Sequence, residues 1–174
     1  MSSRSVALAL LVAGAVALAI GVVKIVGAAD DPEAPPGTGP VAISLQHASP
    51  ATAPFRGLTE ARVDVGGRCL RVAVADSLAE REAGLRGRSD LGLYDGMLFV
   101  FEVPTGVAFT MSGVPVPLEI GFYRRDGARN SVRHMKPCPK VEAECPLYRA
   151  SSEFVYALET LKGKLPAGAV AGCR

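Results

Sequence analysis

The segment PLEIGFY, residues 117–123, places a single carboxylate, Glu119, in an otherwise apolar run. A β-strand here would direct Glu119 to the face opposite that of Leu118 and Ile120. A half-buried carboxylate requires a cationic partner, and we expect that partner to be Arg88, which stands in a glycine-bounded loop. The pair has two interpretations: it orders this loop against a sheet, or it forms the polar end of a ligand pocket.

Two methionines, Met97 and Met111, lie close to this segment. Methionine commonly fills gaps in an apolar core, and this is the interpretation that we favour. The alternative is a thioether site for a soft ion such as Cu(I), completed by Met135 and His134, but nothing in the spacing requires it. The sequence therefore predicts no metal ligand and no cofactor.

Recognisable catalytic patterns are absent from the sequence. It has no Gly-x-Ser-x-Gly and no glycine-rich phosphate loop, and His134 has no obvious nucleophile beside it, so no catalytic residue is assigned. An enzymatic hypothesis remains, in which Glu119 is the acid or base of a hydrolase acting on cell-envelope material. It would need a second carboxylate in the same cleft, from Asp95 or Glu159. The candidate ligand-binding residues are Arg88, Met111 and Glu119.

The four cysteines are Cys69, Cys138, Cys145 and Cys173. Behind an export signal, an even number of cysteines indicates disulfides. Cys138 and Cys145 share one proline-flanked loop, PCPKVEAECP, and are natural partners; Cys69 and Cys173 then pair by elimination. A zinc site is disfavoured because the cysteines do not form two closely spaced pairs, and a redox-active pair is disfavoured because no CxxC occurs.

The N-terminal segment, residues 1–29, reads as a signal anchor or a cleaved signal peptide. Residues 6–23 are eighteen uncharged, mostly aliphatic residues, about the length that crosses a bilayer as a helix. We favour an uncleaved single-pass anchor, which makes the membrane a partner through residues 6–23 and leaves the domain on the extracytoplasmic side. The alternative is secretion after cleavage near Ala29, which follows the small residues Gly27 and Ala28.

Residues 30–56 are rich in proline and alanine and read as a disordered linker, so the expected folded domain is 57–174. The formal net charge is +2, and the basic residues after position 123 have no aromatic residues interleaved with them. These features argue against nucleic-acid binding.

Periodicity predicts a mainly β (α+β) domain. Strands are expected in 62–75 on either side of Gly66-Gly67, then at 97–103, 107–111, 117–125, 130–137 and 154–160, with a tight turn at Asp126-Gly127. One short helix should start after Ser77, where Glu80 completes a capping box, and end at Gly84. About seven closely spaced strands predict a small antiparallel barrel or sandwich rather than a doubly wound fold.

The segments ADSLAEREAGLRGRSD, GMLFVF and FTMSGVPVPLEIGFY resemble the domain of unknown function 192 family across about residues 62–163. The family pattern has tryptophan, lysine and aspartate where this chain has Thr110, Ser112 and Glu119, and methionine where it has Arg86. The matching residues are Glu80, Arg81, Gly84, Leu85, Arg88, Gly96, Met97, Phe99, Phe101, Phe109, Met111, Pro117, Leu118, Ile120 and Glu159.

The resemblance implies a compact β-rich fold and frequent export, but no reaction. We therefore expect a membrane-tethered or secreted envelope domain that acts as a binding or accessory module, with the hydrolase as the alternative.

Overall fold

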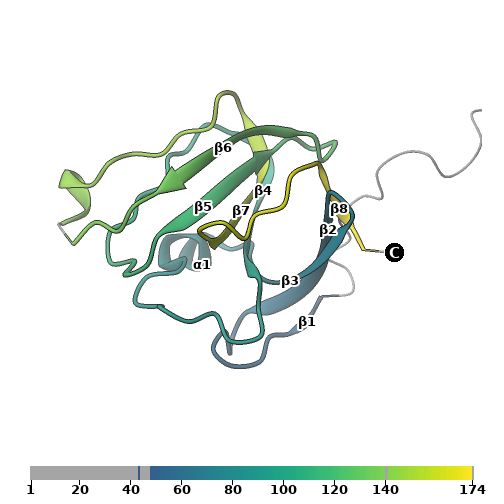
Figure 1. The fold of residues 1–174 in the computed structure, drawn as a ribbon, viewed down its shortest axis with the longest axis horizontal. Helices are drawn as coiled ribbons and strands as arrows, with labels where there is room; N and C mark the ends of the chain where they lie inside the picture. Colours follow the sequence, from purple (N-terminus) through teal and green to yellow (C-terminus); the bar gives the residue numbers. More distant parts are fainter. Residues whose placement is uncertain (1–42, 44–47, 140, 174) are drawn as a thin grey trace, which may run out of the picture. The chain divides into compact units, whose positions relative to one another are not determined.

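The computed structural model describes residues 43, 48–139 and 141–173, all within one compact unit, Gly37–Arg174. Within these residues the fold is one eight-stranded sheet with a single short α-helix (Figure 1). The strands are β1 (Ser49–Pro50), β2 (Thr59–Val65), β3 (Arg68–Ala75), β4 (Gly96–Thr105), β5 (Leu118–Tyr123), β6 (Arg129–Met135), β7 (Phe154–Leu161) and β8 (Val170–Gly172); the helices are α1 (Leu78–Ala83) and the 3-10 turn η2 (Glu142–Glu144).

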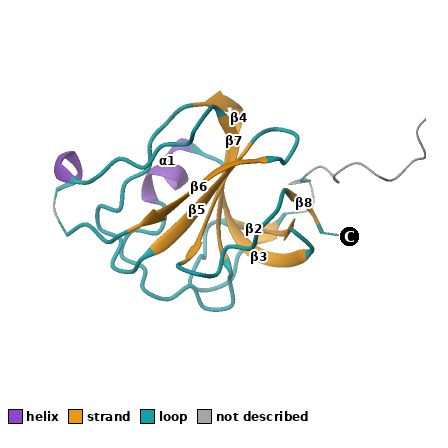
Figure 2. Cartoon of the chain, turned by 45° about the horizontal axis from the view of Figure 1, so that its top comes forward, coloured by secondary structure: helices purple, strands orange, loops and turns teal. Residues whose placement is uncertain are grey.

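The strand order is β1-β2-β3-β4-β7-β5-β6, and β8 also pairs with β2. All neighbouring pairs are antiparallel except β3 and β4, which are parallel. The mainly β class and the single short α-helix are thus confirmed, but the predicted barrel or sandwich is wrong. The sheet does not close on itself: it is one open, strongly twisted sheet whose strands fan apart (Figure 2).

Helix α1 lies in the connection between the parallel strands β3 and β4. It forms where predicted, because the Ser77 hydroxyl accepts from the Glu80 amide while the Glu80 carboxylate accepts from the Ser77 amide. Gly84 ends the helix at a φ of 47°.

Apolar side chains cover both faces of the sheet, because successive residues of a strand alternate between faces. On β4, Met97 and Phe99 enter the larger core while Leu98 and Val100 enter the smaller one. The larger core also receives the segment before β2, through Phe55, which is fully buried. An open sheet is stable here because neither face of its central strands is left to water.

The strand expected at 107–111 does not form. Phe109 makes an isolated bridge with Tyr148 and Ser112 makes another with Cys138, and the rest of residues 106–117 is irregular. Gly113, Pro115 and Pro117 interrupt the segment and prevent regular pairing. Conversely, a strand that the sequence did not predict, β8, pairs with β2 at Val63–Val65.

Strands β8 and β1 lie on the same edge of β2, since β3 occupies the other edge along the whole of β2. Both run antiparallel to β2. Gly172 at the end of β8 faces Val63, and Ser49 at the start of β1 faces Glu60. The two short strands therefore follow one another in the same direction, like a single strand with a gap.

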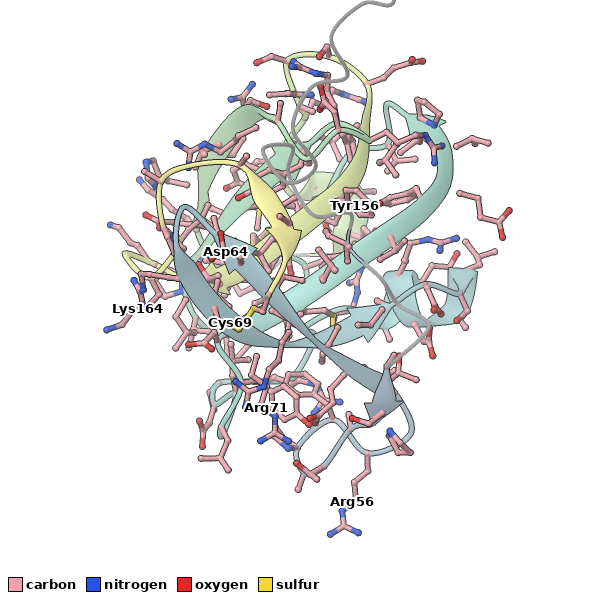
Figure 3. The ribbon with its side chains drawn as sticks, turned by 90° about the vertical axis from the view of Figure 1, so that its right-hand side faces the viewer. Arg56, Asp64, Cys69, Arg71, Tyr156 and Lys164 are labelled. Carbon is pink, nitrogen blue, oxygen red and sulfur yellow. A yellow bond between two sulfur atoms is a disulfide. The ribbon has the colours of Figure 1, made fainter. Side chains whose placement is uncertain are left out.

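Both cysteine pairs are bonded in the combination that the sequence suggests. The Cys69–Cys173 bond, visible beside β3 in Figure 3, joins that strand to the end of β8 across a sequence separation of 104. The Cys138–Cys145 bond closes a loop that carries η2, with a sequence separation of 7.

The folded part starts earlier than residue 57, because β1 and the buried side chains of Ala51 and Phe55 belong to it. The predicted anchor at 1–29, and most of the predicted linker, lie outside the described residues. Within the described part of the chain, no helix is long and apolar enough to cross a membrane.

Candidate functional site

The expected ion pair between Arg88 and Glu119 is wrong. The Arg88 guanidinium donates to the Pro54 carbonyl oxygen at 2.7 Å and lies over the Phe55 ring, 4.7 Å from its centroid. Glu119 instead pairs with His134 across the β5–β6 register, with 2.9 Å between Oε1 and Nδ1. Arg88 thus contacts the segment before β2 instead of Glu119.

Met111 lies in the larger core and is fully buried, and Met97 and Met135, in the same core, are each 1 % exposed. The core-filling interpretation of the methionines is therefore the one that the packing favours. His134 is largely exposed, with 70 % of its side-chain surface open to solvent. Among residues 43, 48–139 and 141–173, no three His, Cys, Asp or Glu side chains gather into a metal-binding group.

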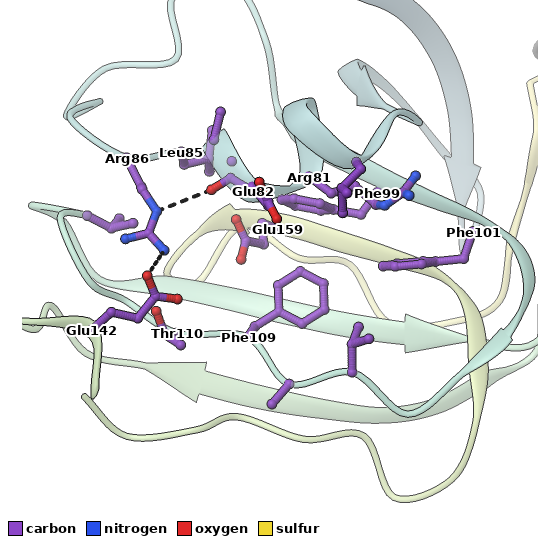
Figure 4. A pocket seen from close by; sticks show the side chains of 16 residues that line it. Arg81, Glu82, Leu85, Arg86, Phe99, Phe101, Phe109, Thr110, Glu142 and Glu159 are labelled. Carbon is purple, nitrogen blue, oxygen red and sulfur yellow. Dashed lines mark hydrogen bonds and ion pairs between the residues drawn. The ribbon is translucent and has the colours of Figure 1, made fainter. Parts of the chain in front are cut away.

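A pocket of about 460 Å³ opens between α1, β4 and the irregular segment 107–114. Its walls are mostly apolar, and none of Arg88, Met111 and Glu119 lines it. In Figure 4 the Glu159 carboxylate lies between α1 and Phe109, and the carboxylates of Glu82 and Glu142 also line the pocket. The lining side chains include several that carry the family resemblance: Arg81, Leu85, Phe99, Phe101, Phe109 and Glu159.

Glu159 lies on β7, between β4 and β5, and its register partners are Met97 and Ile120. It is 4 % exposed, and no hydrogen bond reaches its carboxylate from any of the described residues. Burial therefore raises the pKa of Glu159 to about 8, from an ordinary value of 4.5. Near neutral pH this side chain is mostly a neutral carboxylic acid, able to donate as well as accept a hydrogen bond.

Glu119 and Glu159 cannot act on one substrate from the same cleft. Directly opposed residues of an antiparallel pair point to the same face, so Glu159 shares its face with Ile120. Glu119, the neighbour of Ile120, points to the other face. Asp95 is also elsewhere, since its carboxylate accepts from the backbone amide of Arg71 at 2.8 Å.

Two arginines stand at the rim of the pocket, and both are engaged. Arg86 donates to the carbonyl oxygens of Ser112 at 2.9 Å and Glu82 at 3.2 Å, and to the Glu142 carboxylate at 2.8 Å (Figure 4). Glu142 belongs to η2, so the disulfide-closed loop 138–145 supplies part of this rim.

Arg81 donates to the carbonyl oxygens of Asp76 and Val100, the second at 3.0 Å. Its guanidinium lies 4.9 Å from the centroid of the Phe101 ring. The pocket wall thus already accommodates one cation against an aromatic face.

The aromatic side chains of the wall are fixed by mutual packing. Phe99 and Phe109 meet edge to face with 5.1 Å between their centroids, and Phe109 also packs against Phe122. Such contacts hold the rings without filling the space above Glu159. The site is therefore a preformed, mainly apolar cavity with one buried, unpartnered acid at its floor.

The sequence identified Glu159 only as a matching family residue and as a conceivable second carboxylate. The signal that it carries is its phase: Ala157, two residues earlier on β7, shares its face and enters the larger core, so a carboxylate follows an apolar residue on that face. A single polar residue on the buried face of a strand can be recognised only once it is known which residues of that strand face the core.

Fold and site together define a mainly β domain with a buried-acid pocket. The sequence pattern of DUF192, "Uncharacterized ACR", matches residues 61–171, and the chain belongs to this family. No curated protein matches the sequence.

Two solved structures resemble the chain. A protein of unknown function from Novosphingobium aromaticivorans DSM 12444 is 27 % identical to this chain, with a TM-score of 0.60. The match covers 71 % of this chain and 93 % of the Novosphingobium chain. A putative transcription regulator from Sinorhizobium meliloti 1021 is 25 % identical to this chain, with a TM-score of 0.56. The match covers 66 % of this chain and 95 % of the Sinorhizobium chain.

Proposed function

We propose that this chain is a membrane-tethered, extracytoplasmic binding domain whose small-molecule ligand occupies the pocket beneath α1. The observation that carries the proposal is the carboxyl group of Glu159, which is almost fully buried, lacks any hydrogen-bond donor among the described residues and points into the cavity. Buried polar groups are ordinarily paired, because an unpaired one costs free energy. A ligand that hydrogen-bonds to Glu159 would supply the missing partner.

The extracytoplasmic location is supported by the cysteines. All four are in disulfides, and such bonds persist in oxidising compartments. The apolar segment 6–23 is of the length and composition of a membrane anchor. An alkaline phosphatase reporter fused after residue 174 should be active, because this enzyme requires an oxidising compartment; an inactive but stable fusion would contradict the proposed location.

Binding is favoured over hydrolysis by the separation of the acidic groups. Glu119, the acid or base of the hydrolase hypothesis, has His134 as its partner and faces away from the pocket. Glu142, at the rim, is held by Arg86. The carboxyl groups that line the cavity are Glu82, Glu142 and Glu159, so Glu119, on which the hydrolase hypothesis depends, is not among them.

The description of the Sinorhizobium meliloti neighbour as a putative transcription regulator is not transferred to this chain. The arginines of the β5–β6 hairpin are engaged with their own domain: Arg125 donates to the Glu102 carbonyl oxygen, and Arg129 to that of Pro166. Arg133 donates to the Ser151 hydroxyl. A net charge of +2 and these internal contacts do not favour a nucleic-acid surface.

The proposal is tested by a thermal-shift screen of small molecules against the full chain. Hits should raise the Tm of the wild type but not that of Thr110→Trp, whose indole ring would fill the pocket at a lining position. The matched control is Val103→Trp, which adds the same ring at a position that is 67 % exposed and outside the pocket. Hits that stabilise all three proteins equally, or a screen without hits, would contradict the proposal.

A further inference from the structure

We propose, as an extension of the proposed binding function, that the ligand is an amine: an ammonium group joined to an apolar body, with the ammonium on Glu159 and the body against the phenylalanines. Three observations lead to this class of ligand: the unpartnered carboxyl group, the engaged rim arginines and the aromatic wall.

The state of the rim arginines disfavours an anionic ligand. Arg86 already has three oxygen partners and Arg81 has two carbonyl oxygens, so a ligand carboxylate or phosphate would have to displace existing bonds. It would also lie near the Glu159 carboxyl group, which offers no positive charge. The described lining contains three carboxyl groups (Glu82, Glu142 and Glu159) against two guanidinium groups.

The lining favours a cation for two reasons. An ammonium group donates hydrogen bonds, and a buried carboxylate without donors is the acceptor that gains most from them. Phenylalanine faces also attract cations, and Phe101 already holds the Arg81 guanidinium in this way. A neutral hydrogen-bonding ligand would use only the first of these properties.

The remaining lining fits an apolar body. Leu78, Val107 and Val114 line the pocket together with the phenylalanines, and its volume of about 460 Å³ exceeds the space that an ammonium group needs. Burial of apolar ligand surface against these side chains supplies most of the affinity, and the acid supplies the orientation.

Binding of the amine is coupled to one proton. Below pH 8 the Glu159 side chain carries a proton, which must leave to solvent before the carboxylate can accept hydrogen bonds from the ammonium group. The charged groups that line the same pocket are Arg81 and Glu82 of α1, Arg86 after it and Glu142 of η2; the described parts of β4 and of 107–114 in the lining contribute none. The affinity for an amine should therefore rise with pH.

Isothermal titration of the full chain with three probes of the same apolar body tests this inference: 4-phenylbutylamine, 4-phenylbutanol and 4-phenylbutyrate, each corrected for titration into buffer alone. The amine should bind most tightly at pH 9 and about 100-fold more weakly at pH 6, because a carboxyl group with a pKa of about 8 must lose its proton while the amine, whose own pKa is near 10.4, stays charged. The alcohol should show no such rise.

Glu159→Gln should weaken amine binding and abolish its pH dependence. Glu142→Gln, which changes another carboxyl group of the same pocket, should keep the pH dependence. An amine affinity that is flat between pH 6 and 9 in the wild type would overturn the inference without reference to any variant.

The failure of the inference and that of the binding function are distinguishable. Tighter binding of the alcohol or the carboxylate than of the amine at pH 9 would overturn the ligand class and leave the pocket as a binding site. No heat with any of the three probes at millimolar concentration, together with a thermal-shift screen without hits, would overturn both.

Discussion

At the scale of single residues, the burial of the Glu159 carboxyl group has a cost that depends on pH. Glu159 is 4 % exposed, and burial raises its pKa to about 8. Since the folded state holds this proton more tightly than the unfolded state, the stabilising contribution is complete below pH 4.5. It is lost as pH rises, by up to about 1.4 kcal/mol per pH unit, until it levels off above about pH 8.

Glu159→Gln should remove this part of the pH dependence of stability. At pH 5 we expect the variant to unfold at the same urea concentration as the wild type or at a lower one. At pH 9 it should unfold at a higher concentration than the wild type. The difference in the free energy of unfolding between the two proteins should change by about 3–5 kcal/mol across this range. Urea denaturation at intervals between pH 5 and 9 measures it. The control is Glu153→Gln, at an exposed carboxyl group before β7; equal pH profiles for both variants would refute the expectation.

The Glu119–His134 pair should contribute little to stability. His134 is 70 % exposed, and pairs open to solvent are worth less than about 1 kcal/mol. A double-mutant cycle with Glu119→Gln and His134→Gln, read by urea denaturation, should give a coupling free energy below this limit that shrinks further in 1 M salt. A salt-independent coupling well above 1 kcal/mol would show that the pair organises the fold.

At the scale of elements, the turn between β5 and β6 docks against β8. Gly127 has a φ of 80°, and its carbonyl oxygen accepts from the Val170 amide at 2.9 Å. A Cβ atom at residue 127 would lie 2.1 Å from the Val170 carbonyl oxygen, so the two backbones would have to separate. The glycine therefore permits a close approach between backbones as well as a left-handed conformation.

Gly127→Ala should destabilise the fold far more than Gly163→Ala does. Gly163 has a φ of 78°, but a Cβ atom there would meet nothing within 4 Å. Gly163→Ala reports the cost of the backbone conformation alone, about 1 kcal/mol. Gly127→Ala should add about 1–3 kcal/mol to that cost, because it also displaces the neighbouring backbone. Equal Tm shifts for the two variants would mean that the turn does not pack against β8.

The sequence predicted elements better than it predicted their pairing. Helix α1 and strands β2 and β3 were predictable because the Ser77 capping box and the alternation around Gly66-Gly67 are local signals. The parallel β3–β4 pair and strand β8 were not, because they depend on contacts between residues distant in sequence. The partner of Glu119 was within reach of the sequence, because the predicted Asp126-Gly127 turn sets the β5–β6 register and brings His134 opposite Glu119; the prediction of Arg88 did not use that register.

At the scale of the whole molecule, the two disulfides should differ in their effect on stability. Cys69–Cys173 closes most of the domain, whereas Cys138–Cys145 closes one short loop. On the loop-entropy argument, the first stabilises by about 4.7 kcal/mol and the second by about 2.5 kcal/mol.

Cys173→Ser should therefore lower the free energy of unfolding of oxidised protein more than Cys138→Ser does. Urea denaturation of the two variants measures the difference, and the same series in a reducing agent is the control, in which both variants should match the reduced wild type. The reverse order of the two variants under oxidising conditions would contradict the entropic account.

The shared edge of β2 has a topological consequence. Gly172 and Ser49 face β2 residues three positions apart, a separation of about 10 Å along the strand. Because β8 leads toward β1, the two ends of the folded segment lie close together along the same edge of β2, although the sheet itself is open. A short peptide spliced from the end of β8 to Ser49 would join these two ends, and new termini could then be opened at another surface loop without changing the order of the strands in the sheet.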